Sequence, residues 1–456
     1  MKPETNRLQL DIPDITRREF IARSGKVAAG SALAGVALPH VHAAGESLLR
    51  LALIGCGGRG TGAVADAMNV GQGPLKLVAM ADLVKEKLAG SLGTLTKKFP
   101  EQVEVPAEQC FLGFDAYKKA IDCLRPGDVA LLTTHAAFRP IHLEYAIQKG
   151  VNVFMEKSFA PDPGGTHRML RAGEAAKQKN LKIGCGLMCR HSSARQALIQ
   201  KIRDGELGEI QLTRAYRLDG GGRTGPAQAG DNELIWQIRH PYSFFWVSTG
   251  RLIDYLVHQI DECCWIKDAW PVSAHGLGGR APDSTDCAQN FDTYSIEYTF
   301  ADGSKAMVSQ RGIPKCHTDF STFVHGSKCG AQFSGNIHAP TVQIYKNQRM
   351  ENANIVWRAD KEPMTPYQAE WHVLLDAIRN NKEHNETQRA CYTNLACLMG
   401  RAAVHMGRIV TWEEMMASNF QFCDHLDSLT LDSPPPVKAD AQGRYPAPVP
   451  GVWKEI

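Results

Sequence analysis

The sequence lacks the cysteine spacing of a zinc site or a redox dithiol. Its 456 residues include 13 cysteines, an odd number, and no two of them form a CxxC pair. The nearest pairs are Cys185 with Cys189 and the adjacent Cys263 and Cys264, and neither makes a recognisable ligand set. Several other cysteines lie in apolar runs, where they are typical of small buried hydrophobes. We therefore expect no metal site, and we expect folding in a reducing compartment.

A long basic block and a long apolar run are also missing. The chain has 51 Lys and Arg against 48 Asp and Glu, a net charge of +3, so no nucleic-acid partner is expected. No stretch reaches the ~18 apolar residues of a spanning helix, so no membrane span is expected. With 43% hydrophobic and 22% charged residues, the chain has the composition of a globular protein of two or three domains.

The first 45 residues have the pattern of an export signal. Paired arginines at 17 and 18 precede a short apolar run at 27–38, and small residues follow at 42–45. Paired arginines in this place resemble a twin-arginine signal. The alternative is an amphipathic first helix of the fold. The signal predicts export in the folded state by the twin-arginine machinery, and a periplasmic or otherwise extracytoplasmic location.

A dinucleotide site is predicted directly after this segment. A buried-strand pattern at 48–54 leads into a GxGxxG loop, a helix follows, and a second strand at 75–81 ends at Asp82. Glycines permit the tight turn, the close approach of a pyrophosphate and the packing of helix on strand. Asp82 can accept hydrogen bonds from a ribose and would repel a 2′-phosphate, which favours NAD over NADP. The alternative is an ordinary turn between strand and helix. The predicted loop residues are Gly55, Gly57, Gly58, Arg59 and Gly60.

More strands alternate with helices beyond this point. Strand patterns cover 128–134, 151–155 and 181–184, with a helix at 141–149 between the first two. This order predicts a doubly wound parallel sheet of the Rossmann type. Ligands of such sheets lie beyond the carboxyl ends of the strands. Four side chains at those ends are expected to contact the cofactor: Thr133, Thr134, Glu156 and Lys157.

The pattern of predicted helices and strands changes after residue 190. A helix at 193–203 is followed by strand patterns at 211–218, 293–300, 306–310 and 321–325, and Ala301, Asp302 and Gly303 form a hairpin signal. An α+β domain with one large open, mostly antiparallel sheet fits. The predicted segments are a signal at 1–45, a Rossmann domain at 46–185, the second domain at 186–425 and a Pro-rich arm at 426–456. The arm could wrap a partner subunit or lie on its own chain.

The helix at 251–265 carries a polar stripe. Asp254, His258 and Asp261 are spaced by four and three residues, so they share one face. The stripe could be a solvated face, a histidine made more basic by two carboxylates, or a metal site. Aromatic residues crowd the preceding segment, among them Trp236 and Tyr242. Their rings could stack on a sugar or simply pack in the core.

Several motifs in order resemble the Gfo/Idh/MocA oxidoreductases, from about residue 48 to 420. They are GCGGRG at 55–60, the Glu156-Lys157 pair, DGELGEI at 204–210, the stripe at 254–261 and LMGRAAVHMGRIVTWEE at 398–414. The resemblance implies a Rossmann domain, a second domain whose sheet forms a homo-oligomer interface, and catalysis by Lys157, Asp254 and His258. Arg190, Trp236, Tyr242 and Asp261 are expected near the substrate. The motif reads Glu-Lys-Ser where the family has Glu-Lys-Pro.

These observations predict an NAD(P)-dependent oxidoreductase. Hydride would pass between a sugar or polyol hydroxyl and a nicotinamide cofactor. Because soluble NAD is not exchanged outside the cytoplasm, an exported enzyme would hold its cofactor tightly. One alternative is a redox-neutral glycosidase or lyase acting through a transient keto-sugar. Another is a nucleotide-bound sugar-binding protein without catalysis.

Overall fold

The computed structural model describes residues 48–228, 230–282, 284–338 and 341–456. The predicted twin-arginine segment, residues 1–45, lies outside these residues. Within the described ranges, no helix is both long and apolar enough to cross a membrane. All thirteen cysteines fall in the described part and are free thiols, so disulfides do not stabilise that part.

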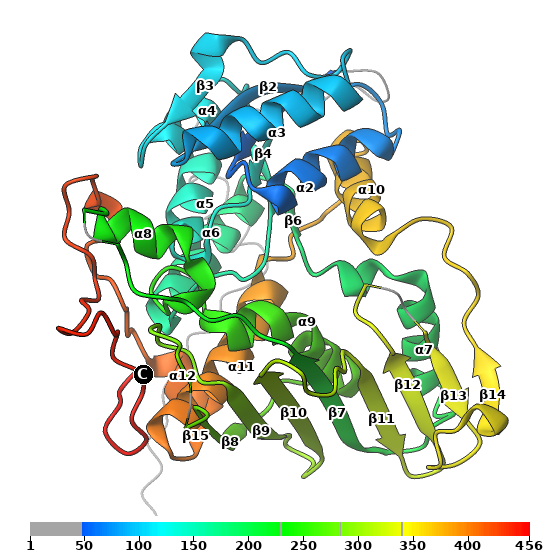
Figure 1. Ribbon diagram of the computed structural model, residues 1–456. Coiled ribbons are helices and arrows are strands. Elements are labelled where there is room, and N and C mark those ends of the chain that lie inside the picture. Colours follow the sequence, from blue (N-terminus) through cyan, green and yellow to red (C-terminus); the bar gives the residue numbers. More distant parts are fainter. Residues whose placement is uncertain (1–47, 229, 283, 339–340) are drawn as a thin grey trace, which may run out of the picture. The chain divides into compact units, whose positions relative to one another are not determined.

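The first sheet has six parallel strands in the order β3-β2-β1-β4-β5-β6 (Figure 1). The predicted doubly wound sheet is therefore confirmed. The order reverses between β1 and β4, and ligands of such sheets bind at the carboxyl edge beside this reversal. The strands are β1 Leu49–Ile54, β2 Leu75–Asp82, β3 Cys110–Leu112, β4 Val129–Leu132, β5 Asn152–Met155 and β6 Ile183–Cys185.

Helices cover both faces of this sheet. One face packs against α2 (Gly58–Asn69), α3 (Lys85–Lys98) and α10 (Pro366–Arg379). The other packs against α4 (Ala116–Asp122), α5 (Arg139–Gln148) and α6 (Pro163–Gln178). The helix α10 begins at a capping box of Thr365 and Gln368. Its Trp371 stacks on Phe154 of β5 with the ring centroids 4.4 Å apart. The chain thus returns to the first sheet after forming most of the second.

The second sheet has nine strands in the order β14-β13-β12-β11-β7-β10-β9-β8-β15. Neighbours are antiparallel except β7 and β10, which run parallel. Between β7 and β10 the chain forms helices and the strands β8 and β9, and β10 then runs in the same direction as β7. The strands are β7 Ile210–Asp219, β8 Ser273–Gly279, β9 Thr293–Thr299, β10 Lys305–Gly312, β11 Thr322–Gly326, β12 Gly330–Ser334, β13 Gln343–Tyr345, β14 Ile355–Arg358 and β15 Val410–Thr411.

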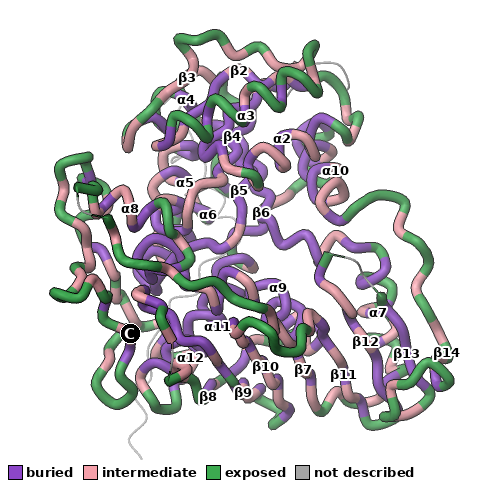
Figure 2. The backbone as a smooth tube through the Cα atoms, in the orientation of Figure 1, coloured by how far each residue is buried: buried purple, intermediate pink, exposed green. Residues whose placement is uncertain are grey.

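One face of the second sheet carries helices. They are α7 (Ser193–Arg203), α9 (Gly250–Lys267) and α11 (Thr387–Met406). Most residues of α9 and α11 are buried (Figure 2). On the other face the side chains are half-buried, as at Met307 and Ser309 of β10. The predicted homo-oligomer through this sheet stays a prediction. The remaining elements are α8 (Glu233–Arg239), α12 (Trp412–Ala417) and short turns η1 (Ala107–Gln109), η2 (Ala136–Phe138), η3 (Met188–His191), η4 (Pro241–Ser243), η5 (Asn352–Asn354) and η6 (Leu426–Ser428).

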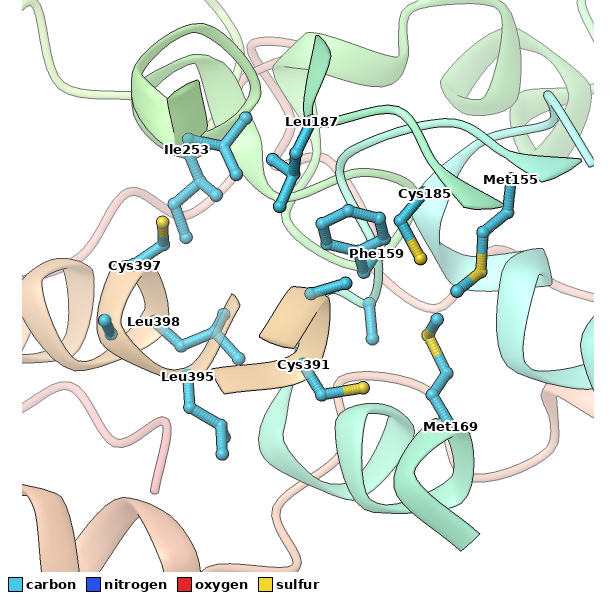
Figure 3. Packing of buried hydrophobic residues seen from close by; sticks show 14 of the residues in the cluster. Met155, Phe159, Met169, Cys185, Leu187, Ile253, Cys391, Leu395, Cys397 and Leu398 are labelled. Atoms are coloured by element: carbon cyan, nitrogen blue, oxygen red, sulfur yellow. The ribbon is translucent and has the colours of Figure 1, made fainter. Parts of the chain in front are cut away.

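A single apolar core joins the two sheets. Figure 3 shows Met155 of β5, Cys185 of β6 and Met169 of α6 facing Ile253 of α9 and side chains of α11, with Phe159 between them. Because this packing is dense, the turn after β5 is held against α9. Residues that follow β5 and residues on α9 therefore meet in one place.

The C-terminal arm lies on its own chain. Glu455 is buried, and its carboxylate pairs with Arg401 at 3.1 Å and with His405 at 3.0 Å, both on α11. Trp453 Nε1 also donates to it, at 2.9 Å. Burial of a carboxylate is favourable only with such partners. The end of the arm is thus an integral part of this fold.

Candidate active site

The glycine-rich loop joins β1 to α2 at the carboxyl edge of the first sheet. Gly55 has φ +101°, and a Cβ there would lie 2.6 Å from the backbone N of Thr134. A Cβ on Gly60 would lie 2.1 Å from the carbonyl oxygen of Gly55. At Gly57 and Gly58 nothing lies within 4 Å of such an atom. Two glycines therefore allow the loop to pack, and two border open space above the first turn of α2, whose N–H groups lack helical partners.

Asp82 lies beside this loop at the end of β2. Its carboxylate accepts from the backbone N–H of Cys56 at 2.6 Å and from that of Val84 at 2.8 Å. Thr133, at the end of β4, donates from Oγ1 to the Gly55 carbonyl at 2.6 Å. Thr134 lies next to it, with Oγ1 3.2 Å from His142 Nδ1. The structure thus brings the predicted cofactor residues of β1, β2 and β4 to one edge.

A cavity opens over this edge. Its wall combines the strand ends with a helix from much later in the chain, α8. The lining includes Gly55, Gly57, Asp82, Lys87, Gly113, Tyr117, Thr133, Thr134, His135, Phe138, Ile238 and Arg239. The wall is mainly apolar and carries a few polar groups, as in small-molecule sites.

Arg59 and Glu156 hold each other. The Arg59 guanidinium pairs with Glu156, lies 3.0 Å from Asp66 and 3.8 Å from Glu370, and covers the ring of Tyr367. Burial and the charge of Glu156 raise the pKa of Glu370 well above its usual range. This pairing ties the glycine-rich loop to the Glu156-Lys157 turn, and the predicted contact of Arg59 and Glu156 with the cofactor stays a prediction.

Lys157, Asp254 and His258 come together at the end of β5. Lys157 Nζ donates to the Asp254 carbonyl at 2.6 Å and lies 3.5 Å from its carboxylate. The Lys157–Ser158 peptide bond is cis, and Ser158 Oγ lies 3.4 Å from the same carboxylate. One turn further along α9, His258 is buried, and its Nδ1 has no hydrogen-bond partner among the described residues. Burial and the charge of Lys157 lower the pKa of His258 well below its usual value, so the ring is a neutral base.

The four residues expected near the substrate have different surroundings in the structure. The Tyr242 ring is 44% exposed and packs on Tyr255 of α9 with the centroids 5.5 Å apart, and the charge of Asp254 raises the pKa of its hydroxyl. Asp261 is turned away. Arg190 holds it through two contacts of 2.8 Å and Thr393 donates to it at 2.7 Å. Trp236 stacks on Tyr445 of the arm, with centroids 5.8 Å apart. Arg190 and Asp261 thus satisfy each other and Trp236 packs on the arm, and the place of these four residues near the substrate stays a prediction.

Residues of the cavity wall that sequence reasoning missed lie far from any motif. Lys87 is on α3, His135 precedes η2, and Ile238 and Arg239 are at the end of α8. No local spacing marks them, since their positions depend on packing between distant segments. The predicted absence of a metal site stays a prediction; within the described ranges, the acidic, histidine and cysteine side chains form no group of three that could hold an ion.

Three buried imidazoles predict a loss of stability on acidification. His142, His258 and His405 are at most 7% exposed. Burial lowers the pKa of each from 6.5, to about 3 for His142. The unfolded chain then binds more protons than the folded one below pH 6.5, so the free energy of unfolding falls as the pH drops through this range. Each group contributes up to about 1.4 kcal/mol per pH unit.

Urea denaturation between about pH 7.5 and 5.5 would measure this slope. The His142→Gln variant is expected to show a smaller slope than the natural protein, whatever its stability at neutral pH. A free energy of unfolding that does not change across this range would contradict the prediction.

Comparison with known proteins places the fold. No family model matches the chain, and no curated protein matches it. Among solved structures, the aldose-aldose oxidoreductase from Caulobacter crescentus in complex with glycerol is 15% identical, with a TM-score of 0.61 over 80% of this chain and 100% of that one. The scyllo-inositol dehydrogenase from Lactobacillus casei with bound NAD(H) and scyllo-inositol is 20% identical, with a TM-score of 0.58 over 80% and 99%.

A putative NADPH-dependent oxidoreductase from Desulfitobacterium hafniense is 18% identical, with a TM-score of 0.61 over 81% of this chain and 99% of that one. All three neighbours are named as oxidoreductases or dehydrogenases. The resemblance drawn from the motifs is therefore confirmed for the fold, with a parallel sheet followed by a mixed one. At such identities the likeness shows the fold alone.

Proposed function

We propose that this protein is an oxidoreductase that oxidises or reduces one hydroxyl carbon of a sugar or polyol with a bound nicotinamide dinucleotide. The observation that carries the proposal is the meeting of Lys157, Asp254 and His258 at the carboxyl edge that also holds the glycine-rich loop. A cation, a carboxylate and a neutral base are the groups that hydroxyl oxidation needs. The neighbours named for aldoses and inositols support the substrate class.

The residues at the loop fit a dinucleotide. The open space over Gly57 and Gly58 leaves room for a pyrophosphate above the start of α2, where free N–H groups favour an anion. Asp82 at the end of β2 is placed to accept hydrogen bonds from ribose hydroxyls. Its carboxylate would repel a 2′-phosphate, so NAD is the preferred form.

The chain's own groups would act on the hydroxyl as follows. Neutral His258 accepts the hydroxyl proton as the carbon is oxidised. Lys157 donates an N–H to the same oxygen and stabilises the negative charge that develops there. Asp254 holds the Lys157 ammonium in position. When bound, the nicotinamide supplies the hydride chemistry.

Identification of the bound nucleotide tests this proposal. The purified protein is denatured and the released nucleotide is analysed by mass spectrometry, and the protein is then assayed for reduction of NAD with a panel of aldoses and inositols. We expect NAD or NADH, and turnover that the His258→Asn variant lacks. NADP in its place would overturn the assignment to Asp82. A protein that neither releases nor binds a dinucleotide would overturn the proposed function.

The predicted export also remains a proposal. An exported enzyme would need a cofactor that stays bound between turnovers, since none is exchanged from solution there. Near-stoichiometric release of NAD from freshly purified protein would support this arrangement.

A further inference from the structure

The helix α8 lies far from the sheet to which its neighbours in sequence belong. It falls in the excursion between β7 and α9, and its first turn is capped by Asn232, whose side chain accepts from Ile235 N–H at 3.0 Å. In Figure 1 it lies apart from the second sheet. Its last two residues, Ile238 and Arg239, line the same cavity as Asp82. A helix outside the first sheet therefore forms part of the wall of the dinucleotide cavity.

Several contacts join α8 to the first sheet's side of this cavity. Ile238 is 5% exposed and belongs to an apolar cluster that also packs against Leu83, Phe114 and Phe138. His135 and Ile238 line the same cavity. Arg239, which lines the cavity, lies 3.9 Å from Glu86 of α3. The wall is thus a packed surface rather than a loose flap.

The C-terminal arm holds α8 in this place. Tyr445 OH donates to Glu233 at 2.8 Å, and its ring stacks on Trp236. Gln237 Nε2 donates to the Val437 carbonyl at 2.6 Å. These contacts lie at the start and in the middle of the short helix, so the arm limits its movement.

The arm is itself tied to the first sheet's helices. Arg168 of α6 contacts both oxygens of Asp427 in η6, at 2.7 and 3.0 Å. Asn232 Nδ2, just before α8, donates to the Leu431 carbonyl at 2.9 Å. Movement of α8 away from the cavity therefore requires breaking a set of contacts that involves two other segments.

We propose that α8, held by the C-terminal arm, closes the adenosine end of the dinucleotide site and retains the cofactor between turnovers. This inference rests on the proposed function. An adenosine bound between Asp82 and Ile238 is released when α8 moves, so the contacts of the arm set the dissociation rate. The predicted class of ligand is a nicotinamide dinucleotide, held through its AMP half.

Dissociation of NADH tests the proposal. The variant Tyr445→Ala removes contacts of the arm with α8 and changes no residue of the cavity wall. Bound NADH is displaced by excess NAD, and the loss of its fluorescence gives the dissociation rate. We expect about a 10-fold or greater increase for Tyr445→Ala, a smaller one for Tyr445→Phe, and no change for the control Val452→Ala, an arm residue that is 73% exposed.

A second measurement keeps the test decisive if Tyr445→Ala does not fold. Amide hydrogen exchange in the natural protein, with and without NADH, should show at least about 10-fold slower exchange for residues 233–239 on binding. Unchanged exchange there, or an unchanged dissociation rate in folded variants, overturns the inference while NADH binding itself stands. Failure of the natural protein to bind any dinucleotide rejects the proposed function instead.

Discussion

Replacing Lys157 with methionine is expected to lower kcat for the sugar or polyol roughly a thousandfold. Methionine replaces the aliphatic part of the side chain up to Cε but lacks the ammonium that lies 2.6 Å from the Asp254 carbonyl. The charge that stabilises the substrate oxygen is then lost. Dinucleotide affinity is expected to change by less than about threefold, since the adenosine and pyrophosphate contacts are elsewhere. Steady-state kinetics and NADH titration measure the two quantities.

The Lys157→Met variant is also expected to change the pH dependence of kcat/KM. The positive charge of Lys157 is one cause of the lowered pKa of His258, after burial. Removal of that charge raises the pKa of His258, so the acidic limb of the residual kcat/KM profile moves to higher pH. The exposed Lys119→Met variant is the matched control and should retain normal kinetics. A loss of kcat under tenfold, with an unmoved acidic limb, would show that Lys157 does not act on the reacting oxygen.

Alanine substitutions at two glycines of the glycine-rich loop are expected to affect different properties, dinucleotide affinity in one case and stability in the other. At Gly57 the added Cβ meets nothing within 4 Å and the backbone has φ −75°, which alanine adopts readily. Gly57→Ala should therefore fold normally, yet the methyl group occupies the space through which a pyrophosphate approaches. We expect dinucleotide affinity to fall on the order of 100-fold, about 2.7 kcal/mol, with Tm unchanged.

Gly60→Ala is expected to fail through the fold. Its Cβ would lie 2.1 Å from the Gly55 carbonyl oxygen and 2.6 Å from Thr133 Oγ1. Relief of this overlap separates α2 from β1 and costs roughly 1–3 kcal/mol of stability or more. Thermal unfolding and NADH titration of both variants separate the two effects. Normal affinity in Gly57→Ala would show that no pyrophosphate lies over this glycine.

The sequence by itself determined the first sheet and the positions of its loop residues. Buried strands, a glycine-rich turn and an acid at a strand end are local signals, and the alternation of strands and helices then predicts a parallel, doubly wound sheet. The stripe on α9 was likewise readable, because Asp254, His258 and Asp261 share one face through the period of a helix. Periodicity and motifs are properties of short segments, so they can be recognised in the sequence without tertiary information.

Only the tertiary structure decided which of these residues act together. Asp261 shares the stripe with His258 but is held by Arg190, a partner 71 residues away. The return of α10 to the first sheet and the placement of α8 on the cavity beside Asp82 also depend on packing between distant segments. Such contacts between distant segments produce no periodic pattern in the sequence, because each depends on complementary shape and charge in the folded protein. The sequence predicted the candidate residues, and the tertiary packing determined which side chains surround them.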